Sequence, residues 1–92
     1  VYEKVLHSYL DSDKTEEIEQ YYKDKDWKNY QVLVHALKSK SLSIGAEELA
    51  EGARALEAAA REGRTDYIME HHEEVMNSYR NLLNLLRRAL QS

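Results

Sequence analysis

The sequence predicts an all-α protein folded as an antiparallel up-down four-helix bundle. The 92 residues include no proline and three glycines, and long stretches are rich in Ala, Leu, Glu, Lys and Arg, which are strong helix formers. Apolar residues also recur every three or four positions along four stretches. Four amphipathic helices joined by short turns pack most simply as such a bundle. Residues 1–92 are therefore interpreted as one domain.

The first stretch, residues 1–25, carries apolar residues at helical spacing in both of its halves. The pattern drifts across Asp11-Ser12-Asp13, where short polar side chains compete for backbone groups. Either one helix bends there, or a second helix begins with Asp13 and Glu16 at the spacing of a capping box. A single bent helix is the favoured interpretation.

The second helix is predicted from Trp27 to Ser43, with Asp26 as its N-cap. Gly45 is expected to end it, because glycine adopts the left-handed conformation without steric cost. The residues of its inward face are apolar and spaced by threes and fours: Trp27, Tyr30, Leu33, Val34, Leu37 and Ile44. At roughly 100° per residue, His35 falls about 130° from the middle of this face and points outward.

The outward face around His35 is where a partner would bind. Lys38 and Ser39 follow the histidine by three and four residues, so both stand beside it. The residues that surround His35 by helical angle are Lys28, Gln31, Val32, Lys38, Ser39 and Leu42. Isolated exposed aliphatics are ordinary, but Val32 and Leu42 around an outward His-Lys pair indicate the centre of a docking patch.

Two more helices complete the predicted bundle. The third runs from Ala46 to Glu62, and its many inward alanines imply a close approach to a neighbouring helix. Gly63 closes it, and the fourth helix, 66–90, is capped by Thr65 or Asp66. The apolar residues of the last helix include Ile68, Val75, Tyr79, Leu82 and Leu86.

Composition excludes several classes of protein. The absence of cysteine removes disulfides and Cys-based zinc sites and fits a cytoplasmic protein. A net charge of −4 with scattered basic residues argues against nucleic acid. No apolar run is long enough to span a bilayer, and no leader is recognised. The first residue is Val1 rather than Met, so a domain cut from a longer polypeptide is expected.

The other histidines do not form a site. His7 has no neighbours with ligand spacing. His72 falls on the inward face of the last helix, which predicts a hydrogen-bonded core or boundary residue. His71 lies at the edge of the same face. The acidic and histidine run 70–74 is not expected to bind a metal, because neighbouring residues on a helix diverge. No Gly-rich phosphate loop occurs, so no nucleotide site is predicted. The aromatic residues Tyr21, Tyr22, Trp27 and Tyr30 are interpreted as core packing.

The outward stretch also resembles a known family. The run His-x-Leu-Lys-(small) from His35 to Ser39, followed by Ile-Gly-Ala at 44–46, resembles the motif of histidine-containing phosphotransfer (HPt) domains. It continues at Leu49, Leu56 and Glu57, where the family usually carries Leu…Leu-Glu. The resemblance covers 27–57 by sequence and the rest by helix layout. Ser39 stands where the family often has glycine, and serine is small enough to leave the histidine accessible.

The resemblance implies a phosphoryl carrier rather than a complete kinase. His35 would exchange a phosphoryl group with receiver-domain aspartates in a multistep phosphorelay, with a hybrid sensor kinase as parent protein or partner. Phosphoryl transfer mainly needs positioning and positive charge, which Lys38 supplies, while Ser39 or Gln31 offers a hydrogen bond. Cofactors are not expected on this chain, and Mg²⁺ belongs to the receiver. The residues expected to bind the response regulator are Lys28, Val32, Ala36, Leu42 and Gly45.

The sequence also fits two other classes of protein. The dimerisation domain of a sensor kinase also presents a histidine on a bundle, but its motif normally carries a proline shortly after the histidine, and this chain has none. A monomer is therefore expected. The second alternative is a non-catalytic helical adaptor with the same fold.

Overall fold

The computed structural model describes residues 2–91, which are helical apart from short turns. No strand occurs among these residues, so the predicted all-α class is confirmed. The molecule is elongated, with dimensions of 42 × 20 × 19 Å. The helices are α1 (Tyr2–Asp11), α2 (Thr15–Asp24), α3 (Trp27–Ser43), α4 (Glu47–Glu62) and α5 (Thr65–Gln91).

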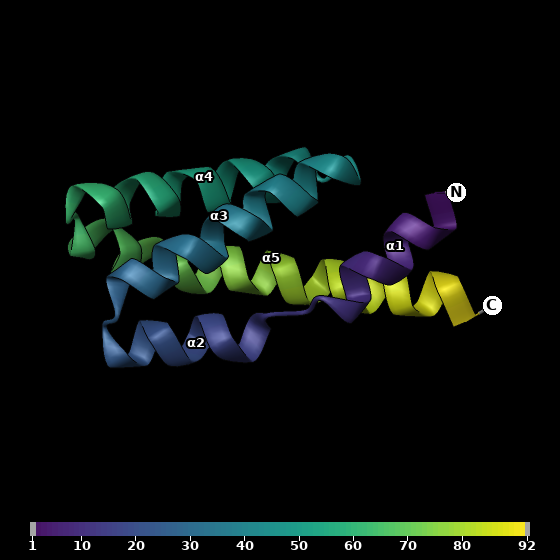
Figure 1. The fold of residues 1–92 in the computed structure, drawn as a ribbon, viewed down its shortest axis with the longest axis horizontal. Helices are drawn as coiled ribbons and strands as arrows, with labels where there is room; N and C mark the ends of the chain where they lie inside the picture. Colours follow the sequence, from purple (N-terminus) through teal and green to yellow (C-terminus); the bar gives the residue numbers. More distant parts are fainter. Residues whose placement is uncertain (1, 92) are drawn as a thin grey trace.

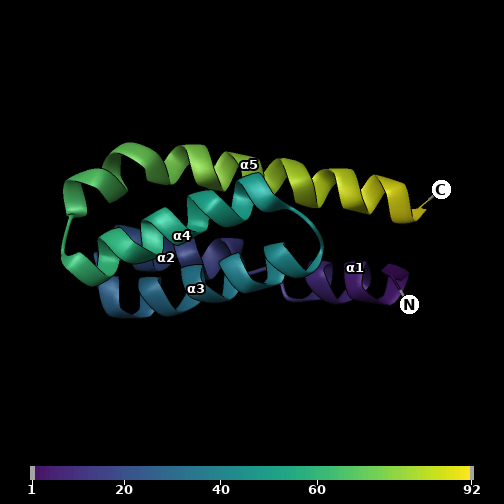
Figure 2. The same cartoon turned by 90° about the horizontal axis from the view of Figure 1, so that it is seen from above.

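Helices α2 to α5 lie side by side along the long axis and are joined end to end, so each reverses the direction of the one before (Figures 1 and 2). The most extensive contact is between α3 and α4, and α5 packs against both α4 and α2. Helix α1 lies apart from this group and packs against the C-terminal part of α5 (Figure 1). Thus α3 is held between α2 and α4, with one face left uncovered.

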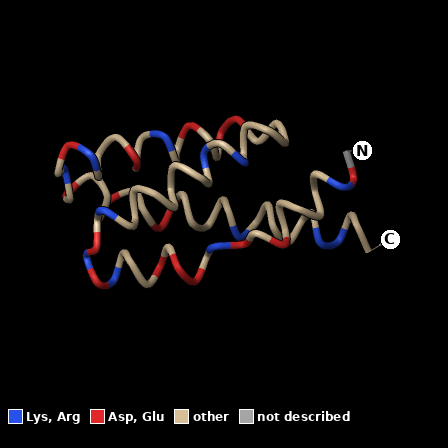
Figure 3. The backbone as a smooth tube through the Cα atoms, in the orientation of Figure 1, with Lys and Arg blue, Asp and Glu red and all other residues tan. Residues whose placement is uncertain are grey.

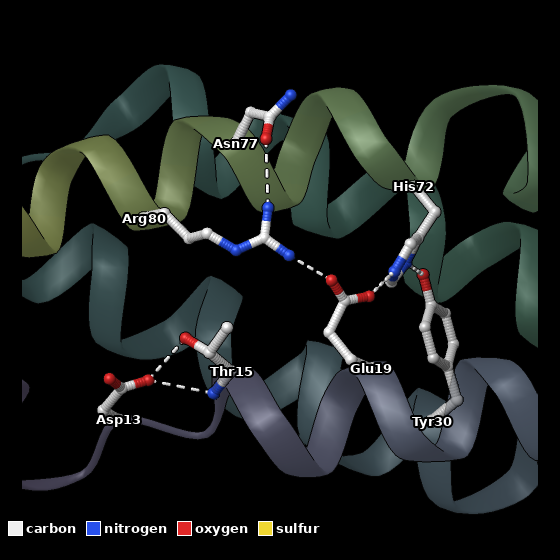
Figure 4. Close-up of polar contacts among 7 residues, drawn as sticks. All are labelled: Asp13, Thr15, Glu19, Tyr30, His72, Asn77 and Arg80. Carbon is white, nitrogen blue, oxygen red and sulfur yellow. Dashed lines mark hydrogen bonds and ion pairs between the residues drawn. The ribbon is translucent and has the colours of Figure 1, made fainter.

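The prediction of a single bent helix over residues 1–25 is wrong. The chain leaves helical geometry between Asp11 and Thr15, and five helices rather than four are found in residues 2–91. The carboxylate of Asp13 accepts hydrogen bonds from the backbone N–H of Thr15 at 2.9 Å and from its hydroxyl at 2.5 Å (Figure 4). The backbone N–H of Lys14 donates to the Tyr79 hydroxyl at 3.3 Å. These partners replace helical hydrogen bonds, which is why the helix stops there.

The other helix ends fall close to their predicted positions. The side chain of Asp26 accepts from the backbone N–H of Asn29 and caps α3 as predicted. Gly45 and Gly63 have φ values of 81° and 73° and end α3 and α4 in the left-handed conformation, also as predicted. The predicted cap of the last helix is wrong, because Thr65 and Asp66 both lie inside α5.

The predicted inward faces form the core. Tyr30, Val34 and Leu37 of α3 are buried, and Trp27, Leu33 and Ile44 pack against them half-buried. Helix α4 contributes Leu49, Ala53, Leu56 and Ala59. A Cβ at Gly52 would lie 3.0 Å from Val75 of α5, so this glycine allows α4 and α5 to approach closely.

The core also contains the predicted hydrogen-bonded histidine. His72 is 1 % exposed, and its Nε2 lies 2.5 Å from a carboxylate oxygen of Glu19 in α2. Because a carboxylate only accepts, Nε2 of the neutral ring carries the hydrogen and Nδ1 accepts from the Tyr30 hydroxyl at 2.8 Å. Arg80 binds the other oxygen of Glu19 (Figure 4). This network joins α2, α3 and α5.

The aromatic side chains at the α2–α3 turn pack around this network. The ring of Tyr22 stacks on His72 with centroids 3.7 Å apart, and Trp27 meets both Tyr22 and Tyr30 edge to face. The prediction that these residues serve core packing is confirmed for this cluster.

Candidate functional site

His35 lies in the middle of α3 on the face that the other helices leave uncovered. Its side chain is 55 % exposed, while the residues on either side of it in the sequence, Val34 and Ala36, are buried and half-buried. The predicted outward direction of the imidazole is therefore confirmed. Helix α3 is anchored by its buried inward face, so this exposed side chain projects from a rigid backbone.

A carboxylate from the neighbouring helix holds one nitrogen of this ring. Glu57 of α4 is 8 % exposed on its side chain, and its Oε2 lies 2.6 Å from Nδ1 of His35. Its Oε1 lies 3.2 Å from Nζ of Lys38, whose side chain is 22 % exposed. Glu57 therefore bridges the histidine and the lysine that the sequence places one turn apart, and it fixes both.

The electrostatics of Glu57 fit this bridging position. Burial raises the pKa of its carboxyl, but the hydrogen bonds and charges of His35 and Lys38 outweigh burial and bring the pKa below its ordinary value. The carboxylate is thus ionised at neutral pH and can only accept a hydrogen bond. Nδ1 of His35 must then carry the hydrogen in the neutral ring, and Nε2 presents a lone pair to solvent.

Arg61 adds a second cation at the edge of this cluster. Nη2 of Arg61, one turn after Glu57 on α4, is 3.5 Å from Glu57 Oε2, and the arginine side chain is 61 % exposed. Glu57 is the one carboxylate in ion-pair contact with Lys38 and Arg61 among residues 2–91. With one carboxylate against two cations, the cluster has an excess of positive charge near His35, which favours an anionic group there.

The remaining predicted site residues occupy the same side of α3 but do not contact the imidazole through hydrogen bonds. Gln31 and Ala36 are half-buried and Ser39 is exposed. Within the described residues, the hydrogen bond of the His35 ring goes to Glu57 and to neither Gln31 nor Ser39. The predicted docking residues Lys28, Val32, Leu42 and Gly45 are exposed, with Val32 and Leu42 at 61 % and 56 %.

Glu57 was not predicted as a site residue, although the sequence contained a signal for it. It follows Leu56 and stands four residues after Ala53 on the inward side of α4. A carboxylate seldom occupies a buried position without a partner. A glutamate at an inward position therefore indicates a cation or donor on the facing helix, and His35 and Lys38 provide both.

Residues 2–91 contain no group of three or more His, Asp or Glu side chains placed to hold a metal ion. Lys and Arg positions are interspersed with Asp and Glu along α2 and α4 (Figure 3). In the same part of the chain, no helix has the length and apolar character that crossing a membrane requires.

The fold and the site define a helical domain that presents one accessible histidine, fixed by a buried carboxylate and flanked by a lysine. The family model for the Hpt domain matches residues 12–91. The chain therefore belongs to the HPt domain family, whose members act in histidine phosphotransfer within two-component signalling. The match confirms the resemblance and extends it from 27–57 to all helices but α1. No curated protein and no solved structure matches the chain.

Proposed function

We propose that this domain is a phosphoryl carrier of a multistep phosphorelay, with His35 as phosphoacceptor. It would take a phosphoryl group from the aspartate of one receiver domain and pass it to the aspartate of another. Helices α2 to α5 would serve as the antiparallel four-helix bundle that presents the histidine. A cytoplasmic location is proposed, because the receivers must reach it there.

The observation that carries this proposal is the 2.6 Å contact between His35 Nδ1 and Glu57. It supports attack by Nε2, which is the nitrogen left with a free lone pair. In that step the lone pair forms an N–P bond to the aspartyl phosphate, the P–O bond to the aspartate breaks, and the aspartate leaves as a carboxylate. The ring becomes positively charged, and the Glu57 carboxylate stabilises that charge through Nδ1–H.

Lys38 is proposed to neutralise the phosphoryl oxygens. The transition state of phosphoryl transfer is loose and spreads negative charge over these oxygens. Lys38 stands one turn from His35, and its contact with Glu57 at 3.2 Å keeps its ammonium group beside the ring. Ser39 would leave the approach open, and either Ser39 or Gln31 would hydrogen-bond a phosphoryl oxygen.

The docking surface is proposed to centre on Val32 and Leu42, with Ala36 between them and Lys28 and Gly45 at its edges. Two aliphatic side chains that are more than half exposed on one helix face suit the apolar helix of a receiver. Such a small interface fits a transient complex. The receiver would bring the acidic pocket and its Mg²⁺, and a hybrid histidine kinase would supply the phosphoryl group. This chain would need no cofactor or nucleotide.

The test is transfer of label from a phosphorylated receiver to the domain. We expect wild type and His7→Gln to acquire acid-labile label, whereas His35→Gln does not. His7 is a matched control, because it is also an exposed histidine on a helix. If several receivers label none of these proteins, the domain is a helical adaptor instead. A monomer in sedimentation experiments is also expected, whereas a stable dimer would favour a kinase dimerisation domain.

A further inference from the structure

A cavity of about 400 Å³ lies between α1 and the C-terminal end of α3, away from the inter-helix contacts that hold Glu57. Its volume falls within the range of small-molecule sites. Its polar lining includes Lys4 and Ser8 of α1 and Lys40 of α3, and its apolar lining is Val5, Tyr9 and Ile44.

The two lysines give the cavity an unbalanced positive charge. In residues 2–91, neither Lys4 nor Lys40 forms an ion pair, although the chain has 17 acidic residues against 13 basic ones. Because the two lysines line the cavity from different helices, an anion bound there would be attracted to both. Ser8, one turn after Lys4, lines the same cavity, and its hydroxyl has no hydrogen-bond partner in the described part of the chain.

The apolar wall of the cavity is fixed by the fold. Tyr9 is 4 % exposed, and its hydroxyl is held by Ser41 of α3 at 2.9 Å. Val5 and Ile44 are half-buried beside it. The cavity therefore combines an apolar surface with two lysines among its lining residues, which is the complement of a molecule that has an anionic group and a small apolar body.

The location sets this cavity apart from the phosphotransfer site. The α1 wall lies wholly before residue 12, where the match with the HPt family begins. Lys40 also follows His35 by five positions on α3, which places the two residues about 140° apart around the helix. The cavity thus depends on a helix that the family match does not include.

We propose that this cavity binds a small organic anion, a carboxylate or phosphate monoester with a ring or short chain. Lys4 and Lys40 would hold the anionic group, the Ser8 hydroxyl would donate a hydrogen bond, and the apolar body would rest on Tyr9, Val5 and Ile44. Because the walls come from α1 and α3, bound anion would also join these two helices, which are otherwise linked by the Tyr9–Ser41 hydrogen bond.

The test is a titration of the ¹⁵N-labelled protein with benzoate, phenyl phosphate, inorganic phosphate and benzamide, followed by amide chemical shifts. Benzoate and phenyl phosphate should give saturable shifts confined to residues 4–12 and 40–44. Benzamide has the same ring without the charge, and inorganic phosphate has the charge without the ring, so each should bind at least fivefold more weakly. Equal binding of benzamide would refute the role of the lysines, and equal binding of phosphate would refute the role of the apolar wall.

Variants locate the site. Lys4→Gln and Lys40→Gln should each weaken benzoate binding about threefold to fivefold, the range for partly exposed charge pairs, and the double variant about tenfold or more. Lys23→Gln, which removes an exposed lysine from α2, should bind as wild type does. Unchanged binding in the double variant, with a wild-type spectrum as proof of folding, would overturn the proposal. So would shifts centred on His35 and Lys38.

Discussion

Replacing Glu57 by glutamine tests how the site activates His35. Glutamine has nearly the same shape and keeps an oxygen that accepts from Nδ1–H, but it removes the negative charge 2.6 Å from the ring. The ring becomes positively charged as the N–P bond forms, and the negative charge of Glu57 stabilises it. The substitution therefore changes the electrostatics of transfer while leaving the packing of α4 against α3 in place.

The structure sets the size of the expected effect. Hydrogen bonds to charged groups contribute about 1.5–3 kcal/mol and neutral ones about 1 kcal/mol, so the loss is about 0.5–2 kcal/mol. His35 is 55 % exposed and water screens the pair, which favours the lower end. Lys38 would also turn from Glu57 toward the phosphoryl group and recover part of the loss. At 1.36 kcal/mol per factor of ten, a loss of about 0.5–1 kcal/mol should slow transfer about twofold to fivefold.

The assay is single-turnover transfer from a phosphorylated receiver, with Glu48→Gln as the control for an exposed glutamate on the same helix. Imidazole ¹⁵N shifts of the unphosphorylated protein should show the hydrogen on Nδ1 of His35 in wild type, with both tautomers populated in Glu57→Gln. A wild-type transfer rate in Glu57→Gln, or label on Nδ1 rather than Nε2, would refute the proposed activation.

Three further outcomes are expected. Lys38→Ala should slow transfer about tenfold, which is the effect of losing one charge-assisted contact to the phosphoryl group. The helical circular dichroism of this variant should be unchanged, and loss of folding would contradict the partly exposed position of Lys38. Glu19→Gln should lower the free energy of unfolding by about 1–3 kcal/mol, because His72 and Arg80, which both bind Glu19, lose a charged acceptor. Urea unfolding measures this, with exposed Glu16→Gln as control, and equal midpoints would show that the network adds no stability. Burial raises the pKa of Tyr9 from 10.0 to about 12, so the folded state retains a proton that the unfolded chain loses. The free energy of unfolding should therefore fall as pH rises from 10 to 12. The fall should be smaller in Tyr9→Phe, and the same slope in both proteins would contradict this assignment.

Local patterns were sufficient to predict most helices and the direction of His35. Asp26, Gly45 and Gly63 act through backbone geometry within a few residues, so their effects can be predicted from neighbours alone. The helix break near Asp13 was harder to predict, because the local sequence fits both a single bent helix and a second helix that begins there. The structure shows a tertiary contribution there, since the Tyr79 hydroxyl accepts the backbone N–H of Lys14 from 65 residues away in sequence.

The sequence by itself determined that the chain is helical and that an imidazole and an ammonium group share one outward face, because helical periodicity depends only on residue spacing. Only the tertiary structure decided that Glu57 joins them, that His72 pairs with Glu19 and Tyr30, and that α1 forms one wall of a cavity with α3. Each of these contacts links different helices, separated by 22 residues or more in the two histidine networks. Their distances depend on how the helices pack, which the periodicity of a single helix does not specify.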